Sequence, residues 1–485
     1  MRVRKTKKIQ RKDGMTKRSL RKSSDRKTGF IPAWRSQLEE DDRRYLWHPF
    51  TQMLEWEKEA PLIIEKGKGV YLWDLSNRKY LDGTSSIWVN LHGHRQARID
   101  RAIITQIQKI AHSTLLGLSN IPAIRLARKL VEIAPKGLTK VFYSDNGSTA
   151  VEVALKIAFQ YWQQKNPQDK RKTKYVSLAN AYHGDTLGAV GVGGIELFHK
   201  LYQPLLLSSY RSPSPYCYRC HLGLTYPSCR IACLEEVEKI LRDHQEEIAA
   251  LVVEPMIQAA AGILVFPPGY LRRLREACTR YRILMICDEV ATGFGRTGKM
   301  FACDYEAVTP DLMAVAKGLT GGYLPLGATL VTQEVYNAFL GKYEEFKTFF
   351  HGHSYTGNQL GCAAALANLE FFEQKKILKK LPVKIGYLSQ LLVPFKSCQH
   401  VGDIRQMGMI VGIELVEDKN LKTPYPIEER QGMKVASEAR KRGLLLRPLG
   451  NVLVLMPPLS TTKMELKQMV EILYDSITAA TGAAC

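Results

Sequence analysis

Runs of consecutive apolar residues alternate with helical patterns between about residues 137 and 332. Five of these runs have the length and composition of strands buried on both faces, and they fall within KVFYSDNGST, KYVSLANAYHG, IAALVVEPM, RILMICDEV and LMAVAKG. Apolar residues recur at helical spacing between the runs, in Val151–Trp162, Leu234–Ile248 and Leu271–Tyr281. Strands without alternation that are linked by helices predict a mostly parallel sheet with helices on both faces.

The first predicted strand leads into a helix start that carries Asn146, Gly147 and Ser148. Thr149 and Glu152 have the spacing of a capping box, which predicts that the helix begins here. Free N–H groups and the helix dipole attract anions to such a start, so a phosphate site is one interpretation and an ordinary helix cap is the other.

The other predicted strands end in one aromatic and several ionisable side chains, namely Tyr182, Glu254, Asp288, Glu289 and Lys317. Ligands of parallel sheets collect at the carboxyl ends of the strands, where these residues would lie. Small residues surround Lys317, and burying an ammonium group is costly unless it is neutralised or paired. A Schiff base removes that charge, so the position indicates covalent chemistry, with a surface lysine as the alternative.

The glycines at positions 293, 295 and 298 match the spacing of a dinucleotide-binding fingerprint. That fingerprint requires a helix that opens inside the motif, whereas the following KMFACDYEAVTPD lacks helical periodicity. A nicotinamide-dependent oxidoreductase is therefore a minor alternative. We expect a tight loop that Arg296 fixes, with Glu289 in a structural role.

The composition is that of a globular protein, with 485 residues of which 45% are hydrophobic. The length predicts two or three domains. No apolar run approaches the roughly 18 residues needed to span a bilayer, and no secretory signal opens the chain. We expect a soluble cytoplasmic protein with no membrane partner.

Half of the net charge of +22 lies in residues 1–30, which hold 13 Lys or Arg against two Asp. This segment reads as a disordered basic tail. The alternatives are a start codon placed too early, with Met15 as one possible start, an organelle transit peptide, or a nucleic-acid-contacting arm. A nucleic-acid-binding protein that uses the tail is thus a competing functional hypothesis, although we regard a nucleic-acid partner as the weaker one.

Four of the ten cysteines form two closely spaced pairs in PYCYRCHLGLTYPSCRIAC, namely Cys217, Cys220, Cys229 and Cys233. Tetrahedral zinc takes soft ligands in such pairs, so a structural zinc ion is one interpretation. Reduced packing thiols and redox chemistry stay open. The other six cysteines stand among apolar residues and read as free packing thiols.

Several motifs together resemble the class III aminotransferases, which depend on pyridoxal 5′-phosphate (PLP). They are SDNGSTAVEVALK, AYHGDTLGA, CDEVATGFGRTGKMFACD, DLMAVAKGLTGGYLPLGAT and FFHGHSYTGNQLGCAAA. YLWHPFTQM, SSIWVNLHGH and RPLGNVLVLMPPL further resemble the members that convert 8-amino-7-oxononanoate to 7,8-diaminononanoate in biotin synthesis. The resemblance runs from about Tyr45 to the C-terminus.

The resemblance implies PLP-dependent transferase fold type I, an α/β fold with a mostly parallel central sheet in a large domain and a smaller α+β domain. The domains expected are a tail at 1–30, an N-terminal segment joining the small domain at 31–84, a large PLP-binding domain at 85–350 with a Cys-rich insert at 215–234, and a small domain at 351–485.

The resemblance also implies the site. Lys317 matches the Schiff-base lysine, Asp288 the partner of the pyridine nitrogen, and Tyr182 the aromatic residue stacked on the ring, and these three are the expected catalytic residues. Ser354 matches a hydroxyl that reaches the phosphate from the neighbouring subunit, which implies a homodimer with a shared site. The full set of cofactor contacts is Asn146, Gly147, Ser148, Tyr182, Glu254, Asp288, Lys317 and Ser354.

On the substrate side, the resemblance implies that Arg447 binds the oxononanoate carboxylate and that Trp88 and Phe50 line the pocket. Phe50 stands where many members have tyrosine, and Ile87 where many have a second tryptophan. The amino donor is therefore either S-adenosylmethionine or lysine. Another class III enzyme that acts on ω-amino acids or diamines is a further alternative.

Overall fold

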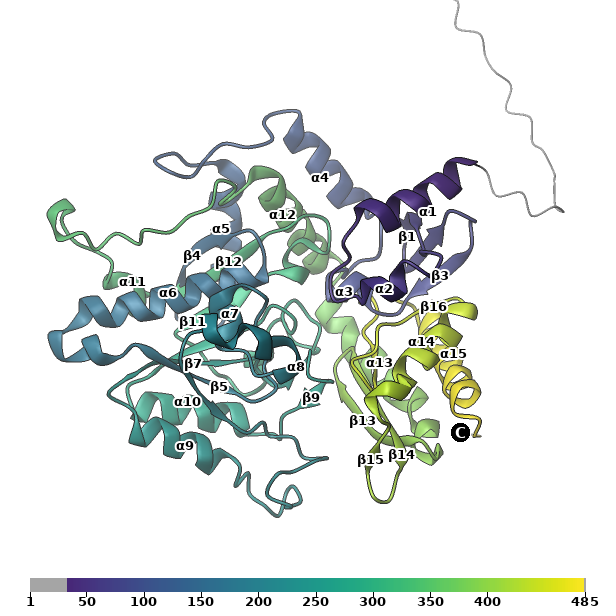
Figure 1. Cartoon of the computed structure of the whole chain (residues 1–485). Helices are drawn as coiled ribbons and strands as arrows, with labels where there is room; N and C mark the ends of the chain where they lie inside the picture. Colours follow the sequence, from purple (N-terminus) through teal and green to yellow (C-terminus); the bar gives the residue numbers. More distant parts are fainter. Residues whose placement is uncertain (1–32, 484–485) are drawn as a thin grey trace, which may run out of the picture. The chain divides into compact units, whose positions relative to one another are not determined.

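The computed structural model describes residues 33–483 in two units, and the predicted basic tail lies outside the described residues (Figure 1). The described part of the first unit, residues 33–63, contains α1 (Ala33–Tyr45) and α2 (Met53–Trp56). The Asp42 carboxylate holds this unit together, because it accepts a hydrogen bond from Trp56 Nε1 at 2.8 Å and lies 3.1 Å from His48 Nε2.

A seven-stranded sheet forms the centre of the second unit, residues 64–485, with the strand order β4-β12-β11-β10-β7-β5-β6. In that order the strands are β4 (Leu138–Ser144), β12 (Gly327–Thr332), β11 (Leu312–Val315), β10 (Leu284–Asp288), β7 (Ile248–Val253), β5 (Lys174–Leu178) and β6 (Ser209–Ser212). Strand β12 is antiparallel to both of its neighbours, and the other pairs are parallel. The five strands and the mostly parallel sheet predicted from the sequence are confirmed, whereas β6 and β12 were not predicted.

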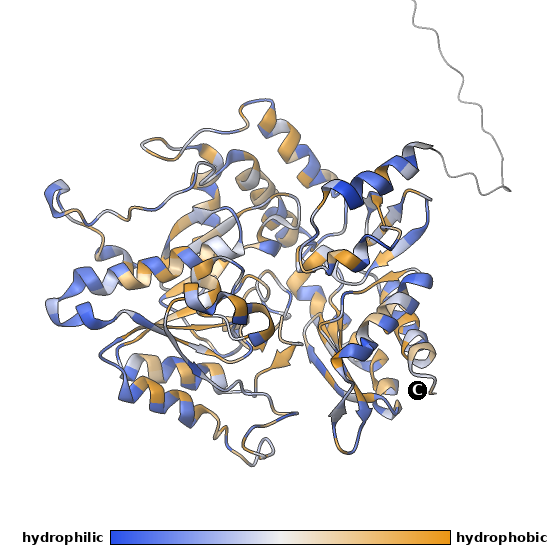
Figure 2. Cartoon of the chain, in the orientation of Figure 1, coloured by the Kyte–Doolittle hydropathy of each residue, from blue (hydrophilic) through white to orange (hydrophobic). Residues whose placement is uncertain are grey.

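Helices cover both faces of this sheet, because its strands are apolar on both sides. One core contains Leu251 and Val253 of β7 together with residues of α9 (Leu234–Asp243) and α10 (Tyr270–Arg280). The other contains Ala250 and Val252 of the same strand together with residues of α6 (Gly147–Lys165). Figure 1 shows α9 and α10 side by side, and Figure 2 shows the apolar colouring of the strands. The period of two along β7 thus supplies both cores.

The start of α6 differs from the prediction. The cap is Asn146, whose side chain accepts the Thr149 N–H at 3.0 Å, while the Thr149 hydroxyl accepts the Asn146 N–H at 3.0 Å. The predicted box of Thr149 and Glu152 is wrong. The Glu152 carboxylate instead accepts the N–H groups of Gly188 at 2.6 Å and Ala189 at 3.1 Å, so it fixes the short helix α7 (Leu187–Gly191).

Two further sheets involve the C-terminal part of the chain. The first has the order β1 (Ile64–Lys68), β2 (Tyr71–Asp74), β3 (Lys79–Asp82) and β16 (Leu444–Leu445), and the second joins β13 (Val401–Met407), β14 (Ile410–Asp418), β15 (Thr423–Pro424) and β17 (Val452–Leu455). Because β16 pairs in parallel with β3, residues near the C-terminus share a sheet with residues 64–82. The domain boundaries expected from the sequence stay a prediction.

The remaining helices are α3 (Ser85–Trp88), α4 (Ala97–Ile107), α5 (Ile121–Ile133), α8 (Glu196–His199), α11 (Gln333–Asn337), α12 (Gln359–Gln374), α13 (Ile377–Leu391), α14 (Gln431–Lys441) and α15 (Lys463–Thr481), and the remaining strands are β8 (Ile257–Gln258) and β9 (Leu264–Val265). Within residues 33–483, no helix combines the length and the apolarity that crossing a bilayer requires.

Candidate active site

The carboxyl ends of four neighbouring parallel strands carry the residues that the sequence singled out. Lys317 follows β11, Asp288 ends β10, Glu254 follows β7, and Tyr182 follows β5. These strands lie next to one another in the sheet, so their carboxyl ends meet at one edge. The fold therefore brings the predicted catalytic residues together.

Asp288 is held by His183, a residue that the sequence analysis did not single out. Asp288 Oδ2 lies 2.8 Å from His183 Nδ1, and Asp288 Oδ1 accepts the Val290 N–H at 3.0 Å. Both side chains are buried. His183 Nε2 is buried without a hydrogen-bond partner among the described residues. The available signal was a histidine directly after the aromatic residue at a strand end.

Glu254 is buried at the same edge, and both oxygens of its carboxylate bind backbone N–H groups. Its Oε1 accepts the Tyr182 N–H at 3.2 Å, and its Oε2 accepts the Ala259 N–H at 3.0 Å. Burial raises the pKa of Glu254 to about 7. The Tyr182 hydroxyl donates to Asp185 Oδ2 at 2.8 Å, and burial together with this carboxylate raises the pKa of Tyr182. Tyr182 is thus held at its backbone by Glu254 and at its hydroxyl by Asp185.

Lys317 lies at the first position of a short 3-10 turn, with a φ of 44°. Burial lowers the pKa of its ammonium group, while the nearby carboxylates of Asp288 and Glu254 act in the opposite direction. Its Nζ lies 4.8 Å from the centroid of the Trp88 ring. The lysine is therefore an amine of weakened basicity, between two carboxylates and an indole.

The N-terminus of α6 forms an anion-binding site at the same edge. Asn146 caps Thr149, and the N–H groups of Gly147 and Ser148 have no acceptor one helical turn back. Space is tight, because a Cβ atom on Gly147 would lie 2.6 Å from Val290 Cγ1. The free N–H groups and the close approach of the backbone fit a phosphate group.

Arg296 ties its glycine-rich loop to two other segments. The guanidinium is 1% exposed and donates to Pro457 O at 2.7 Å, to Asn90 O at 2.7 Å and to Trp88 O at 3.3 Å. Burial lowers the pKa of Arg296 to about 9. No helix opens within the loop, as the sequence predicted, so the nicotinamide fingerprint lacks its structural context.

Three predicted site residues are not joined to this edge by any contact described. Arg447 is exposed and makes no hydrogen bond or ion pair with residues 33–483. Ser354 is exposed in a turn before α12. Phe50, with a φ of 50° and 58% exposure, belongs to the unit of residues 33–63. Their roles stay predictions.

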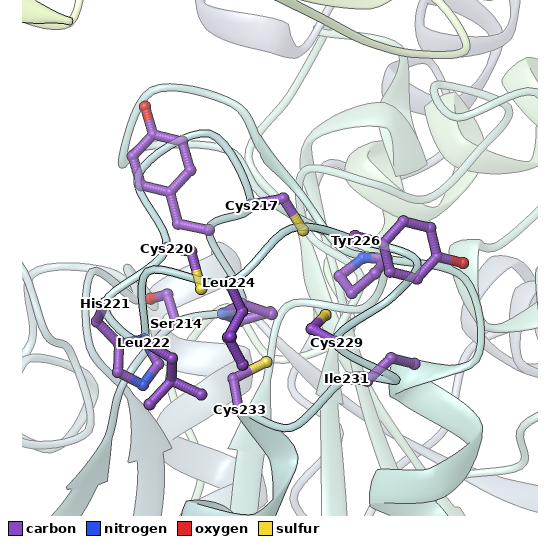
Figure 3. Close-up of a pocket in the computed structure, with 13 residues that line it drawn as sticks. Ser214, Cys217, Cys220, His221, Leu222, Leu224, Tyr226, Cys229, Ile231 and Cys233 are labelled. Atoms are coloured by element: carbon purple, nitrogen blue, oxygen red, sulfur yellow. The ribbon is translucent and has the colours of Figure 1, made fainter. Parts of the chain in front are cut away.

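The Cys-rich insert brings its four cysteines to one cavity of ≈ 20 Å³, as Figure 3 shows. Burial and the other three thiols raise the pKa of Cys233 to about 11. As the thiols are placed, the described chain contains no group of three or more His, Cys, Asp or Glu side chains that could hold a metal ion. Elsewhere, Cys398 is disulfide-bonded, so its expected role as a free packing thiol is wrong.

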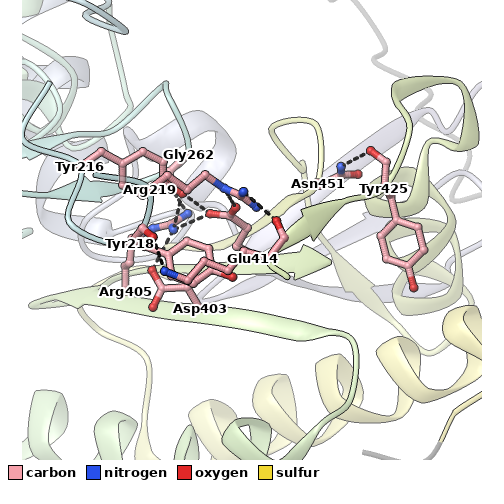
Figure 4. A network of polar contacts seen from close by, with 10 residues as sticks. Tyr216, Tyr218, Arg219, Gly262, Asp403, Arg405, Glu414, Tyr425 and Asn451 are labelled. Carbon is pink, nitrogen blue, oxygen red and sulfur yellow. Dashed lines mark hydrogen bonds and ion pairs between the residues drawn. The ribbon is translucent and has the colours of Figure 1, made fainter. Parts of the chain in front are cut away.

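A buried charge network anchors the insert to β13 and β14 (Figure 4). Arg405 donates to Glu414 Oε2 at 2.6 Å and to Tyr216 Oη at 2.9 Å, and Arg219 donates to Glu414 Oε1 at 2.7 Å. Removing one partner of such a network strands an uncompensated charge. Tyr216 and Arg219 at the start of the insert are therefore fixed independently of the cysteines.

The family profile of the class III aminotransferases matches residues 53–477. An adenosylmethionine-8-amino-7-oxononanoate aminotransferase from Geobacter sulfurreducens is 54% identical over 446 residues, which cover 92% of this chain and 98% of that protein. The chain belongs to the class III aminotransferases.

Solved structures agree with this assignment. The crystal structure of an adenosylmethionine-8-amino-7-oxononanoate aminotransferase from Methanocaldococcus jannaschii has a TM-score of 0.87 and 47% identity, and it covers 92% of this chain and 99% of that chain. An (S)-enantioselective omega-transaminase from Thermomicrobium roseum has a TM-score of 0.87 at 32% identity, with coverage of 92% and 98%. The predicted family, fold type I and enzyme class are confirmed, and the cofactor of this family is PLP.

Glu289 next to the catalytic edge supplies a test of the buried charges. It is fully buried, its Oε1 accepts the Cys303 N–H at 2.8 Å, and burial raises its pKa to about 7. The folded pKa lies above the unfolded value of about 4.3, so this group's contribution to stability is complete below that value and is lost as pH rises through 7.

Replacing Glu289→Gln should remove this loss. We expect the melting temperature of the variant, relative to the natural protein, to improve between pH 5 and pH 7.5, corresponding to at most about 3 kcal/mol. Thermal unfolding of both proteins at the two pH values measures it. A difference that stays constant with pH would contradict the raised pKa.

Proposed function

We propose that this aminotransferase transfers an amino group to 8-amino-7-oxononanoate and produces 7,8-diaminononanoate in biotin synthesis. S-Adenosylmethionine is the proposed donor, and lysine is the alternative. The proposal rests chiefly on the edge where Lys317, Asp288 and the start of α6 meet, in a chain 54% identical to the Geobacter sulfurreducens adenosylmethionine-8-amino-7-oxononanoate aminotransferase.

The residues present suit PLP at each of its functional groups. The free N–H groups of Gly147 and Ser148 would bind the phosphate, and the buried Asp288 carboxylate would accept the pyridine N–H. Tyr182 would cover the ring. When bound, PLP supplies an electron sink for the bond broken at the amine carbon.

The protein groups then move and hold protons. Burial lowers the pKa of Lys317, which favours the neutral amine that accepts a proton from the donor carbon and returns one to the acceptor. The Asp288 carboxylate would favour the protonated pyridine nitrogen of a bound cofactor, and His183 at 2.8 Å fixes the direction of that carboxylate. Glu254 fixes the Tyr182 backbone. Two successive half-reactions imply ping-pong kinetics.

The proposed substrate contacts come from Arg447, Trp88 and Phe50. The exposed guanidinium of Arg447, which has no partner within residues 33–483, suits the carboxylate of a long-chain acid. Trp88 already lies against Lys317, so an indole wall beside the reacting amine is supported. Phe50, which carries no hydroxyl, and Ile87 leave the choice of donor open.

We also propose a homodimer in which Ser354 reaches the partner's phosphate site. A monomer rarely exposes a large contiguous apolar patch on its surface. The exposed apolar residues in α5, just before α5 and before α12 are Leu116, Leu118, Ile121, Ile124, Tyr343, Phe346, Phe350 and Tyr355.

The purified protein with PLP should form 7,8-diaminononanoate from 8-amino-7-oxononanoate and one of the two donors. Lys317→Ala should lower turnover at least about a thousandfold, because removing an acid-base group and the covalent anchor costs that much or more. Product formation by mass spectrometry measures both.

Far-UV circular dichroism of Lys317→Ala controls for folding. Turnover with lysine alone would select the alternative donor. Turnover of ω-amino acids or diamines without any reaction of 8-amino-7-oxononanoate would replace the proposal by another class III activity.

Ser354→Ala should leave the dimer intact and weaken PLP retention about tenfold, the effect of one lost charge-assisted hydrogen bond. Cofactor release on dilution, followed by absorbance, and size-exclusion chromatography measure the two properties. Ser389→Ala, on the exposed side of α13, is the control. A monomeric protein, or unchanged retention, would contradict the shared site.

The cysteine cavity carries a separate proposal, a structural zinc ion bound by the four thiols. Two close pairs that line one small cavity support it, and binding would require the thiols to draw together. Protein grown with zinc should hold one zinc per chain by elemental analysis, and Cys217→Ser should lose it while Cys362→Ser retains it. A metal-free protein with four titratable thiols would establish the packing alternative.

A further inference from the structure

Residues Ser85–Trp88, the element α3, form one turn of left-handed helix. Their φ angles are 51°, 50°, 63° and 70°. The Trp88 N–H bonds to Thr84 O at 2.8 Å, and the Val89 N–H bonds to Ser85 O at 3.1 Å. L-residues avoid this form because Cβ crowds the following carbonyl oxygen, and a β-branched residue such as Ile87 suffers most. Such strain persists only where the surroundings impose it, and it concentrates at functional sites.

Asp82 holds the first half of the turn. Its carboxylate is 1% exposed, Oδ1 accepts the Ser86 N–H at 2.9 Å, and Oδ2 accepts the Ser86 hydroxyl at 2.8 Å. His94 Nε2 lies 3.0 Å from Oδ2. Burial by itself raises the pKa of Asp82, but the bonds from His94 and Ser86 outweigh it and hold the pKa below its ordinary value. A charged carboxylate therefore faces the N–H end of the turn.

Arg296 and the Met456 carbonyl group hold the rest of the turn. Arg296 donates to Trp88 O and Asn90 O at the carbonyl end of the turn, and Ser85 Oγ donates to Met456 O at 2.6 Å. Negative charge at the N–H end and positive charge at the carbonyl end both complement the turn's dipole. The strained conformation is thus clamped from both ends by buried, opposite charges.

The clamped turn determines where Trp88 stands. The indole lies against Lys317, with 4.8 Å between Nζ and the ring centroid. Any relaxation of the turn to the right-handed or extended form would redirect this side chain, since the direction of Cβ follows the backbone.

We propose that Asp82 is a positioning residue of the active site: it holds Ser85–Trp88 in the left-handed turn that sets Trp88 as a wall of the substrate pocket beside Lys317. This inference rests on the proposed aminotransferase function. It concerns substrate binding, not the proton transfer itself.

The variant Asp82→Asn keeps the shape of the side chain and removes its charge. The KM values of both substrates should rise about tenfold while kcat changes less than about threefold, because a binding wall is lost and the proton-transfer groups stay in place. The melting temperature should fall, since the strain is no longer opposed by a charged acceptor. Unchanged KM values would overturn the proposal.

Ile87→Gly tests the strain directly, because glycine adopts positive φ without a steric cost. Its melting temperature should rise while the KM values change less than about threefold, because glycine favours the same left-handed turn and Trp88 stays in place. The matched control is Lys376→Gly, which relieves a φ of 50° before α13. It should raise the melting temperature and leave the kinetics unchanged. A lower melting temperature for Ile87→Gly would show that the turn is not strained.

The double variant Asp82→Asn/Ile87→Gly separates positioning from general stability. The melting temperature and the KM values should both recover toward those of the natural protein, because glycine favours the left-handed turn without the charged acceptor. KM values that stay at the level of Asp82→Asn while the melting temperature recovers would show that Asp82 does not act through the turn and would overturn the proposal.

Melting temperatures are measured without substrate, so they test the strain independently of the proposed function. The kinetics use whichever donor and acceptor pair the natural protein converts. Failure to convert 8-amino-7-oxononanoate would therefore count against the proposed function alone, while an unaltered KM with a working pair would count against Asp82.

Discussion

The structure depends on holding ionisable groups at a mostly buried edge of the central sheet. Lys317 stands between Asp288, Glu254 and the Trp88 ring, at the carboxyl ends of strands whose two faces are both covered by helices. Charge in such a place is stable only when it is paired or hydrogen-bonded. The surrounding contacts supply this, with His183 on Asp288 and backbone N–H groups on Glu254. The same burial tunes the lysine toward the neutral amine, so one constraint serves both stability and chemistry.

Sequence patterns predicted the strands of the central sheet that carry these ionisable groups. Strands β7, β10 and β11 are buried along their whole length, so they stand out as continuous apolar runs, and the structure confirms all five predicted strands. Strand β12 (Gly327–Thr332) was missed although it is buried along most of its length, because Gly327, Thr329 and Thr332 interrupt its apolar pattern. The cap of α6 was misplaced by three residues, because Asn146 and Thr149 satisfy each other and release Glu152 for another helix.

Long-range partners lay beyond the sequence. His183 and Asp288 are 105 positions apart, and only the adjacency of β5, β7 and β10 brings them together. The left-handed turn was equally hidden, because SSIW contains neither glycine nor asparagine, the residues that usually mark positive φ. Each such residue costs about 1–2 kcal/mol, so the sequence alone argues against the conformation that the structure adopts. Buried charges at Asp82 and Arg296 offset that cost. Asp82 stands three residues before the turn without a pattern that marks it as buried, and Arg296 is 208 positions from Trp88.

The two arginines of the recognised motifs show why residue type alone does not assign a role. Arg296 donates from both terminal nitrogens to the carbonyls of Trp88, Asn90 and Pro457, and its Nε is buried without a hydrogen-bond partner among the described residues. Arg447 is exposed and has no partner among the described residues, so all of its donors are available. A carboxylate needs a planar, bidentate partner, and both terminal nitrogens of Arg296 already donate to backbone carbonyls. The buried arginine therefore fixes its loop, and the exposed one is the proposed carboxylate contact.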